Sequence, residues 1–257
     1  MRAYVITIGN EILKGRTINT NAAHIGRVLT YAGYDVIRMV VVPDEIDEIV
    51  WAFRDGLSRA DLIVSTGGLG PTFDDKTVEA LAKALNLELE LNQEAFSMVK
   101  SKYDRLGVEL TKERIKMAYM PKGAKPLPNP VGTAPGVYIE YAGKRILTLP
   151  GVPAEMEAIL DEALPQLRVP GRYYYEESVV VRGIMESALA PVVNEVMRLN
   201  AGLVYVKSHP KGIEIDKPVV EVEVSASGSS EEEVRGRVKE AIRQLVSRAK
   251  SINPQCC

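Results

Sequence analysis

The feature that most constrains this chain is a glycine-rich segment at residues 67–72, Gly-Gly-Leu-Gly-Pro-Thr. It follows a continuous apolar run at residues 62–64, which predicts a buried strand, and precedes a helical pattern over residues 75–85. In an open α/β sheet, a glycine-rich turn between strand and helix lets backbone amides approach an anion. The segment therefore predicts a phosphate-binding loop for a nucleotide-like or pterin-like small molecule, with a simple tight turn as the alternative.

This loop matches neither of the two common nucleotide motifs. Gly68 and Gly70 supply a G-x-G pattern, but Phe73 stands where the dinucleotide fingerprint has its third glycine. The Gly-Lys-Ser/Thr ending of the P-loop is also missing from the segment. The loop therefore indicates phosphate chemistry without specifying a nucleotide class.

Short apolar runs alternate with amphipathic segments over the first two thirds of the chain, as in βαβ units on a parallel sheet. We therefore predict an α/β fold with a doubly wound, mostly parallel sheet. The predicted strands are residues 3–8, 35–42, 62–64, 136–141 and 145–149, and the predicted helices are residues 19–31, 44–57, 75–85, 93–106, 111–117 and 153–163.

A Pro-flanked connection at residues 165–171 predicts a domain boundary. The first domain is expected at residues 1–167 and a smaller α+β module at residues 172–250, with a βαββα order of elements. Residues 251–257 are expected to form a frayed tail in which Cys256 and Cys257 stay reduced; a lipidated or redox-active pair is the alternative.

The bulk composition of the 257 residues is that of an ordinary globular protein. The 32 basic and 34 acidic residues give a formal net charge of −2, which argues against a dedicated nucleic-acid or membrane-surface protein. No apolar run approaches the roughly 18 residues of a membrane span. We therefore expect a cytoplasmic protein with a small-molecule ligand.

Two adjacent carboxylates, Asp74 and Asp75, stand beside the glycine loop. Neighbouring acids at a phosphate site are explained most economically by a hard divalent cation. Capping of the following helix is the alternative, because aspartate favours the first turn of a helix. Asp75 is the better candidate for function, and Asp74 for a cap or a helper.

Other polar residues follow the predicted strands directly. Asn10 and Glu11 come after the first strand and Asp44 after the second, although Asp44 could equally cap a helix. Because the carboxyl ends of parallel strands meet at one edge of a sheet, we expect these residues to share one crevice with the glycine loop. The segments at residues 129–136 and 150–153, rich in glycine and proline, are either structural turns or loops shaped around a ligand.

Five separated motifs together resemble the N-terminal domain of the CinA family, which has the molybdopterin-binding, MoaB/Mog-like fold. They are residues 8–15 with Thr20 and Asn21, then residues 42–44, 66–77, 129–136 and 149–156. Residues 172–250 are similar to the small KH-like module that follows in CinA proteins. The chain ends before the C-terminal amidohydrolase domain that many members carry, so that activity is not expected.

The resemblance implies metal-dependent hydrolysis of the pyrophosphate bond of ADP-ribose or a related nucleotide. In molybdopterin-binding relatives, the positions matching Asp75 and Asp44 line the pterin site, and the position matching Glu11 lies near it. Molybdopterin binding or adenylyl transfer is therefore the first alternative to hydrolysis. A non-catalytic nucleotide or RNA binder is the second alternative, although the near-neutral charge makes nucleic acid an unlikely partner.

The candidate site combines catalytic, metal-binding and substrate-binding residues. Catalysis is expected from Asp75, Asp74 and Glu11, with Asp75 and Asp74 also holding Mg²⁺, Mn²⁺ or Co²⁺. A homodimer is expected. The residues expected to bind the substrate are Gly67, Gly68, Gly70, Thr72, Asn10, Asn21, Asp44, Asn129, Gly132, Thr133 and Gly151.

Overall fold

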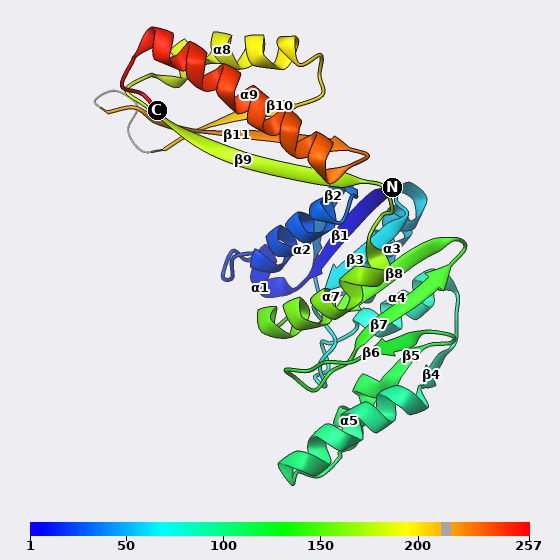
Figure 1. The fold of residues 1–257 in the computed structure, drawn as a ribbon. Helices are drawn as coiled ribbons and strands as arrows, with labels where there is room; N and C mark the ends of the chain where they lie inside the picture. Colours follow the sequence, from blue (N-terminus) through cyan, green and yellow to red (C-terminus); the bar gives the residue numbers. More distant parts are fainter. Residues whose placement is uncertain (212–216) are drawn as a thin grey trace. The chain divides into compact units, whose positions relative to one another are not determined.

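The computed structural model describes residues 1–211 and 217–257 (Figure 1). The chain divides into two compact units. Unit 1 comprises Met1–Thr30 and Tyr34–Arg168, and unit 2 comprises Tyr31–Gly33 and Val169–Cys257. Among the described residues, no helix combines the length and the apolar character needed to cross a membrane.

Unit 1 is built on a six-stranded sheet with the order β2-β1-β3-β8-β7-β6. The first four strands in this order are parallel, and β7 and β6 are antiparallel to their neighbours. This topology confirms the predicted doubly wound, mostly parallel sheet. The strand bounds are β1 (Arg2–Ile8), β2 (Asp35–Val42), β3 (Leu62–Thr66), β6 (Lys125–Leu127), β7 (Gly136–Tyr141) and β8 (Lys144–Leu149).

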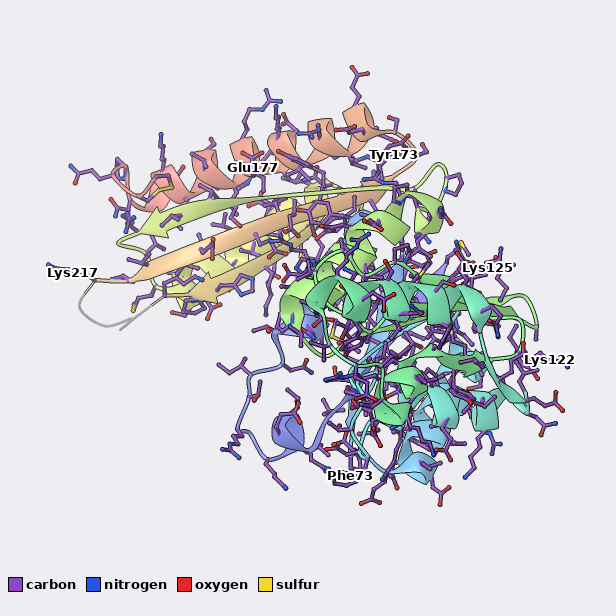
Figure 2. All side chains as sticks on the ribbon, turned by 90° about the horizontal axis from the view of Figure 1, so that it is seen from below. Phe73, Lys122, Lys125, Tyr173, Glu177 and Lys217 are labelled. Carbon is purple, nitrogen blue, oxygen red and sulfur yellow. A yellow bond between two sulfur atoms is a disulfide. The ribbon has the colours of Figure 1, made fainter. Side chains whose placement is uncertain are left out.

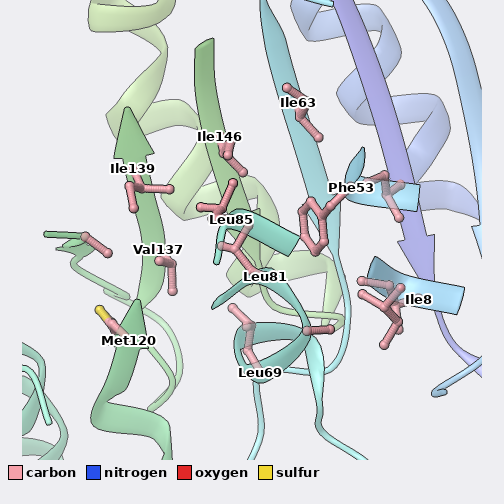
Figure 3. Packing of buried hydrophobic residues seen from close by; sticks show 14 of the residues in the cluster. Ile8, Phe53, Ile63, Leu69, Leu81, Leu85, Met120, Val137, Ile139 and Ile146 are labelled. Carbon is pink, nitrogen blue, oxygen red and sulfur yellow. The ribbon is translucent and has the colours of Figure 1, made fainter. Parts of the chain in front are cut away.

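Helices cover both faces of this sheet (Figure 1). On one face, Ile63 of β3 packs in the main core with Phe53 and Leu81, from two different helices (Figure 3). Side chains alternate along a strand, so Thr66 of β3 points to the other face, where it meets Asn21. The helices of unit 1 are α1 (Asn10–Leu13), α2 (Thr20–Tyr31), α3 (Ile46–Arg59), α4 (Thr77–Leu85), α5 (Gln93–Leu106), α6 (Lys112–Ile115), the 3₁₀ turn η1 (Lys116–Ala118) and α7 (Pro153–Leu167).

Helices α3 and α4 each begin two residues later than the sequence pattern predicts. Helix α3 begins at Ile46. The Asp44 carboxylate does not cap it but accepts a hydrogen bond from the backbone N–H of Asn10 at 2.8 Å. Helix α4 begins at Thr77 because the Asp75 carboxylate accepts the Thr72 amide at 2.8 Å. The N-cap residues are Glu45 and Lys76, so the cap alternatives for Asp44, Asp74 and Asp75 are wrong. The Asp74 carboxylate accepts from the Thr72 hydroxyl instead.

Three short strands in unit 1 were not expected from the sequence. They are β4 (Leu89–Leu91), β5 (Tyr119–Pro121) and β6 in the proline-rich passage. Strands β4 and β5 pair with each other as a separate antiparallel ribbon. Strand β5 of this ribbon directly follows η1, which carries part of the candidate site described below.

Unit 2 has the predicted βαββα order of elements. Its three strands form an antiparallel sheet with the order β10-β11-β9, and α8 and α9 pack on that sheet around a core rich in valine. The sequence pattern predicts a strand only at residues 178–181, and β9 extends this strand to ten residues. The elements are β9 (Tyr173–Arg182), α8 (Glu186–Leu199), β10 (Tyr205–Pro210), β11 (Val219–Gly228) and α9 (Glu231–Ile252).

The C-terminal residues are ordered against unit 2, so the expectation of a frayed, reduced tail is wrong. Cys256 is buried in the core and forms a disulfide with Cys257. The Cys256 carbonyl accepts a hydrogen bond from the Arg182 amide at 2.8 Å. The amide side chain of Asn253 contacts the carbonyls of Arg182 and Gly183. These contacts fix the segment after α9, and no local sequence pattern predicts them.

Candidate functional site

The glycine loop has a backbone that only glycine can adopt at its first two positions. Gly67 has φ +106° and Gly68 has φ +67°. A Cβ on Gly67 would lie 2.2 Å from the Ile8 carbonyl, and a Cβ on Gly68 would lie 2.2 Å from Thr77 Oγ1. The Thr77 hydroxyl donates to the Gly67 carbonyl at 2.8 Å. The loop is therefore clamped between the end of β1 and the start of α4, with no side chain to keep a ligand away from its amides.

Two carboxylates converge on one hydroxyl at the end of this loop. Asp75 Oδ2 and Asp74 Oδ1 each lie 2.5 Å from Thr72 Oγ1. A hydroxyl carries a single proton, so it can donate to only one of them at a time. The hydrogen bond from Thr72, together with the nearby Lys116 and Lys76, holds the pKa of Asp74 below its usual range. Two carboxylates close together around one hydroxyl favour a positive charge nearby.

The third predicted catalytic carboxylate does not join this pair. The Glu11 side chain folds back over its own turn, where a Cβ added at Gly9 would lie 2.6 Å from Glu11 Oε1. Within residues 1–211 and 217–257, no three His, Cys, Asp or Glu side chains converge to hold a metal ion. Asp74 and Asp75 still fit Mg²⁺, because that ion is usually held by one or two carboxylates together with substrate phosphates.

The single crevice expected from the sequence is divided into two hollows at the same edge of the sheet. The larger one, here called the glycine-loop cavity, has a volume of about 210 Å³ and is lined by Gly68, Leu69, Gly70, Asp75, Val78, Glu79, Leu89, Lys116, Met117 and Tyr119. The smaller one, here called the Asn21 cavity, has about 80 Å³ and is lined by Thr7, Glu11, Ile12, Thr17, Ile18, Asn19, Thr20, Asn21, Thr66, Gly151 and Pro153.

The Asn21 cavity is shaped by a buried hydrogen-bond network. The Asn21 side chain donates to Thr66 Oγ1 and to the Gly151 carbonyl, both at 2.9 Å. Thr66 in turn donates to the Pro150 carbonyl at 2.7 Å. Both hydrogens of the Asn21 amide are thus used to tie α2 to the ends of β3 and β8. Asn21 and Gly151 therefore have a structural task in addition to lining a hollow.

Asn10 and Asp44 lie at the same edge but line neither cavity. Besides the Asp44–Asn10 contact, the Lys76 ammonium donates to the Asp44 carbonyl at 3.1 Å. Lys76 thereby joins the segment after β2 to the glycine loop. This arrangement holds the loops together, and the structure does not bring Asp44 to Asp75 as a shared pterin-facing pair.

The predicted residues of the 129–136 segment form a cluster of their own. Asn129 is buried; its amide donates to Glu155 Oε2 at 2.6 Å and to the Ala134 carbonyl at 2.8 Å, and its oxygen accepts the Gly132 amide at 2.7 Å. Gly132 leaves room for Glu155, since a Cβ there would lie 2.1 Å from the carboxylate carbon. Thr133 belongs to the same loop, and all three predicted residues lie outside the two cavities.

One wall of the glycine-loop cavity consists of residues that were not predicted from the sequence. It comes from β4, η1 and β5 and contributes Leu89, Lys116, Met117 and Tyr119. The Lys116 ammonium donates to the Thr72 carbonyl at 2.6 Å and so reaches the loop from the outside. Phe73, beside that contact, projects from the surface of unit 1 and is 88% exposed (Figure 2). No short motif around residue 116 signalled this contact.

The fold and this edge define a class of protein: a doubly wound α/β domain with a glycine loop at the carboxyl end of its central strands, where such folds bind small ligands. Residues 4–169 match the family described as probable molybdopterin binding domain. The chain belongs to this family.

Known proteins resemble this chain over most of its length. A protein from Pyrobaculum arsenaticum is 52% identical over 252 residues, which are 97% of this chain and 95% of that protein. A protein from Thermoplasma acidophilum is 50% identical over 240 residues, 93% of each chain. A crystal structure of the protein CinA from Thermoplasma acidophilum, described as having unknown function, is 54% identical, with a TM-score of 0.62, and covers 65% of this chain and 97% of that chain. The resemblance drawn from the five motifs is thereby confirmed.

Proposed function

We propose that unit 1 binds a phosphate-bearing pterin of the molybdopterin class, with the phosphate on the amides of the glycine loop. The observation that carries this proposal is the loop itself. At Gly67 and Gly68 its φ angles are positive and an added Cβ would clash, so both positions require glycine, and the loop borders a cavity. The family match supports the pterin over other phosphorylated ligands. This reading was the first alternative from the sequence, and it has better support than hydrolysis.

The size and lining of the glycine-loop cavity fit one ring with a phosphate beside it. Its volume of about 210 Å³ is below the about 300 to 1,000 Å³ of pockets that enclose a whole drug-sized ligand. Leu89, Met117 and Tyr119 offer apolar contact to a flat ring on one side. Gly68 and Gly70 of the glycine loop also line the cavity. The remainder of the ligand would extend from the open mouth of the cavity.

The test is a titration of the purified protein with molybdopterin. We expect saturable binding by the wild type and a loss of binding in Gly68→Ala, whose Cβ would collide with Thr77 Oγ1. Gly70→Ala is a milder second variant, because its Cβ meets only the tip of the Asp75 side chain. Gly143→Ala is the matched control: Gly143 also has a positive φ, +75°, but lies in the β7–β8 hairpin turn. Wild-type affinity in folded Gly68→Ala and Gly70→Ala would contradict the proposal.

Hydrolysis of the pyrophosphate bond of ADP-ribose is a second candidate, favoured by the convergence of Asp74 and Asp75 on Thr72. A bound Mg²⁺, Mn²⁺ or Co²⁺ would supply positive charge and a water of lowered pKa. The two aspartates would orient the phosphates, and the loop amides would stabilise negative charge as it develops on the phosphoryl oxygens. Water adds to one phosphorus, the P–O–P bridge breaks, and AMP and ribose 5-phosphate are released.

This candidate predicts a defined response to one substitution. Asp75→Asn nearly preserves size but removes the anionic ligand, so we expect ADP-ribose turnover to fall by about 10²-fold or more. Turnover should also cease in EDTA and return with added metal. Asp104→Asn, a surface carboxylate paired with Lys100, is the control and should keep wild-type turnover. If Asp75→Asn or EDTA leaves turnover unchanged, metal-dependent hydrolysis is excluded and pterin binding stands alone.

A further inference from the structure

The lining of the glycine-loop cavity has an unequal balance of charge. Asp75 and Glu79 contribute carboxylates, Asp74 lies next to Asp75, and among the described residues that line the cavity the one cation is Lys116. A phosphate that enters here meets two or three negative groups and needs a positive group to offset the repulsion. Lys76 is less suitable, because its ammonium is directed to the Asp44 carbonyl and it does not line the cavity.

Lys116 is an exposed side chain on a firmly held base. The next two residues, Met117 and Ala118, are buried in the core. The Ala118 carbonyl accepts the Asn92 amide at 3.0 Å, which joins η1 to the start of α5. An ammonium group has three donors, and one of them is directed to the Thr72 carbonyl at 2.6 Å. Because the backbone of η1 is held in place, the reach of the Lys116 ammonium is limited. The other donors of this ammonium remain for a ligand at the mouth of the cavity.

The contact with Thr72 also links Lys116 to the shape of the loop. The Asp75 carboxylate accepts hydrogen bonds from the backbone amide and the hydroxyl of Thr72. The Lys116 ammonium donates to the Thr72 carbonyl. A neutral carbonyl is a weaker partner for an ammonium than a phosphate is. A phosphate that approaches the loop amides would therefore draw the ammonium toward itself.

We propose that Lys116 is the cation that binds the phosphate of the ligand at the glycine loop, and that it holds the loop through the Thr72 carbonyl in the free protein. This inference rests on the proposed phosphate site and adds a residue to it from a distant part of the chain. It also assigns the ribbon of β4 and β5, together with η1, a role: they carry the cation to a loop that is itself rich in carboxylates.

The test compares Lys116→Met with Lys116→Arg, using inorganic pyrophosphate as the probe in calorimetric titration. Losing a hydrogen bond to a charged group should weaken pyrophosphate binding by about 10- to 100-fold in Lys116→Met. Lys116→Arg keeps the charge and should recover most of the affinity. Lys112→Met, an exposed lysine one turn earlier on the same segment, is the matched control and should bind like the wild type.

Two further readouts test the two parts of the inference: binding of a phosphate-free ligand separates phosphate binding from a merely structural role, and hydrogen exchange reports the hold on the loop. Binding of 6-hydroxymethylpterin, which has no phosphate, should be unchanged in Lys116→Met, and amide hydrogen exchange at residues 70–75 should be faster than in the wild type or Lys116→Arg. Wild-type pyrophosphate affinity in Lys116→Met, or equal loss of both probes, overturns the inference. If the wild type itself fails to bind pyrophosphate, the proposed phosphate site fails; if Gly68→Ala loses binding and Lys116→Met does not, only the role of Lys116 fails.

Discussion

At the scale of single residues, the clearest electrostatic feature of unit 1 lies around Asp55 on α3, away from both cavities. Its carboxylate accepts hydrogen bonds from Arg59 Nε at 2.7 Å, the Tyr4 hydroxyl at 2.9 Å and the Arg38 guanidinium at 3.1 Å. The bond from Arg59, followed by those of its other partners, lowers the pKa of Asp55. Burial, together with the bond to Asp55, raises the pKa of Tyr4 to about 12.

This cluster gives a prediction for stability against pH. Because the pKa of Asp55 is lower in the folded chain than in the unfolded chain, its contribution is present above the unfolded pKa and is lost as the pH falls through the folded pKa. Asp55→Asn should therefore lower Tm by about 2 to 6 °C at pH 7 and by much less at pH 3. Calorimetric scans at both pH values check this. An equal loss at both would show that the charge of Asp55 contributes nothing.

At the scale of elements, the long apolar strands and the amphipathic helices could be predicted because their patterns are local. Residues 62–66 of β3 are all buried, and the run Leu-Ile-Val predicted this for residues 62–64. Strands β4 and β5 could not be predicted in this way. Each has three residues and is defined by pairing across a gap in sequence, as in Leu89 with Pro121. A three-residue pattern does not distinguish such a strand from a loop.

The residues of the candidate site can also be divided into those with a local sequence signal and those without one. The glycine loop and the pair Asp74 and Asp75 were found from the sequence, because a positive φ and adjacent carboxylates leave a local mark. The contact of Lys116 with Thr72 joins residues 44 positions apart, and no local sequence pattern signals it. The alternative uses of Asp44 could not be separated either, since the same spacing suits a helix cap and a tertiary acceptor.

At the scale of the whole molecule, the division into two units predicts that unit 1 is self-sufficient. Unit 1 has its own six-stranded sheet and its own hydrophobic core. The expected homodimer and cytoplasmic location stay predictions.

A fragment of residues 1–168 should therefore unfold in one cooperative thermal transition and bind pyrophosphate as the full chain does. Circular dichroism melts and the same calorimetric titration, with the full chain as the control, check both points. A fragment without a cooperative transition would show that unit 1 depends on the residues after 168.

A crystal structure with molybdopterin bound would show whether the glycine loop binds the phosphate of a small ligand. We expect the phosphate oxygens about 2.7 to 3.2 Å from backbone amides of residues 68–70, with the ring toward Leu89, Met117 and Tyr119. A phosphate seated elsewhere, for example in the hollow beside β6 that is lined by Lys125 and Arg145, would contradict it.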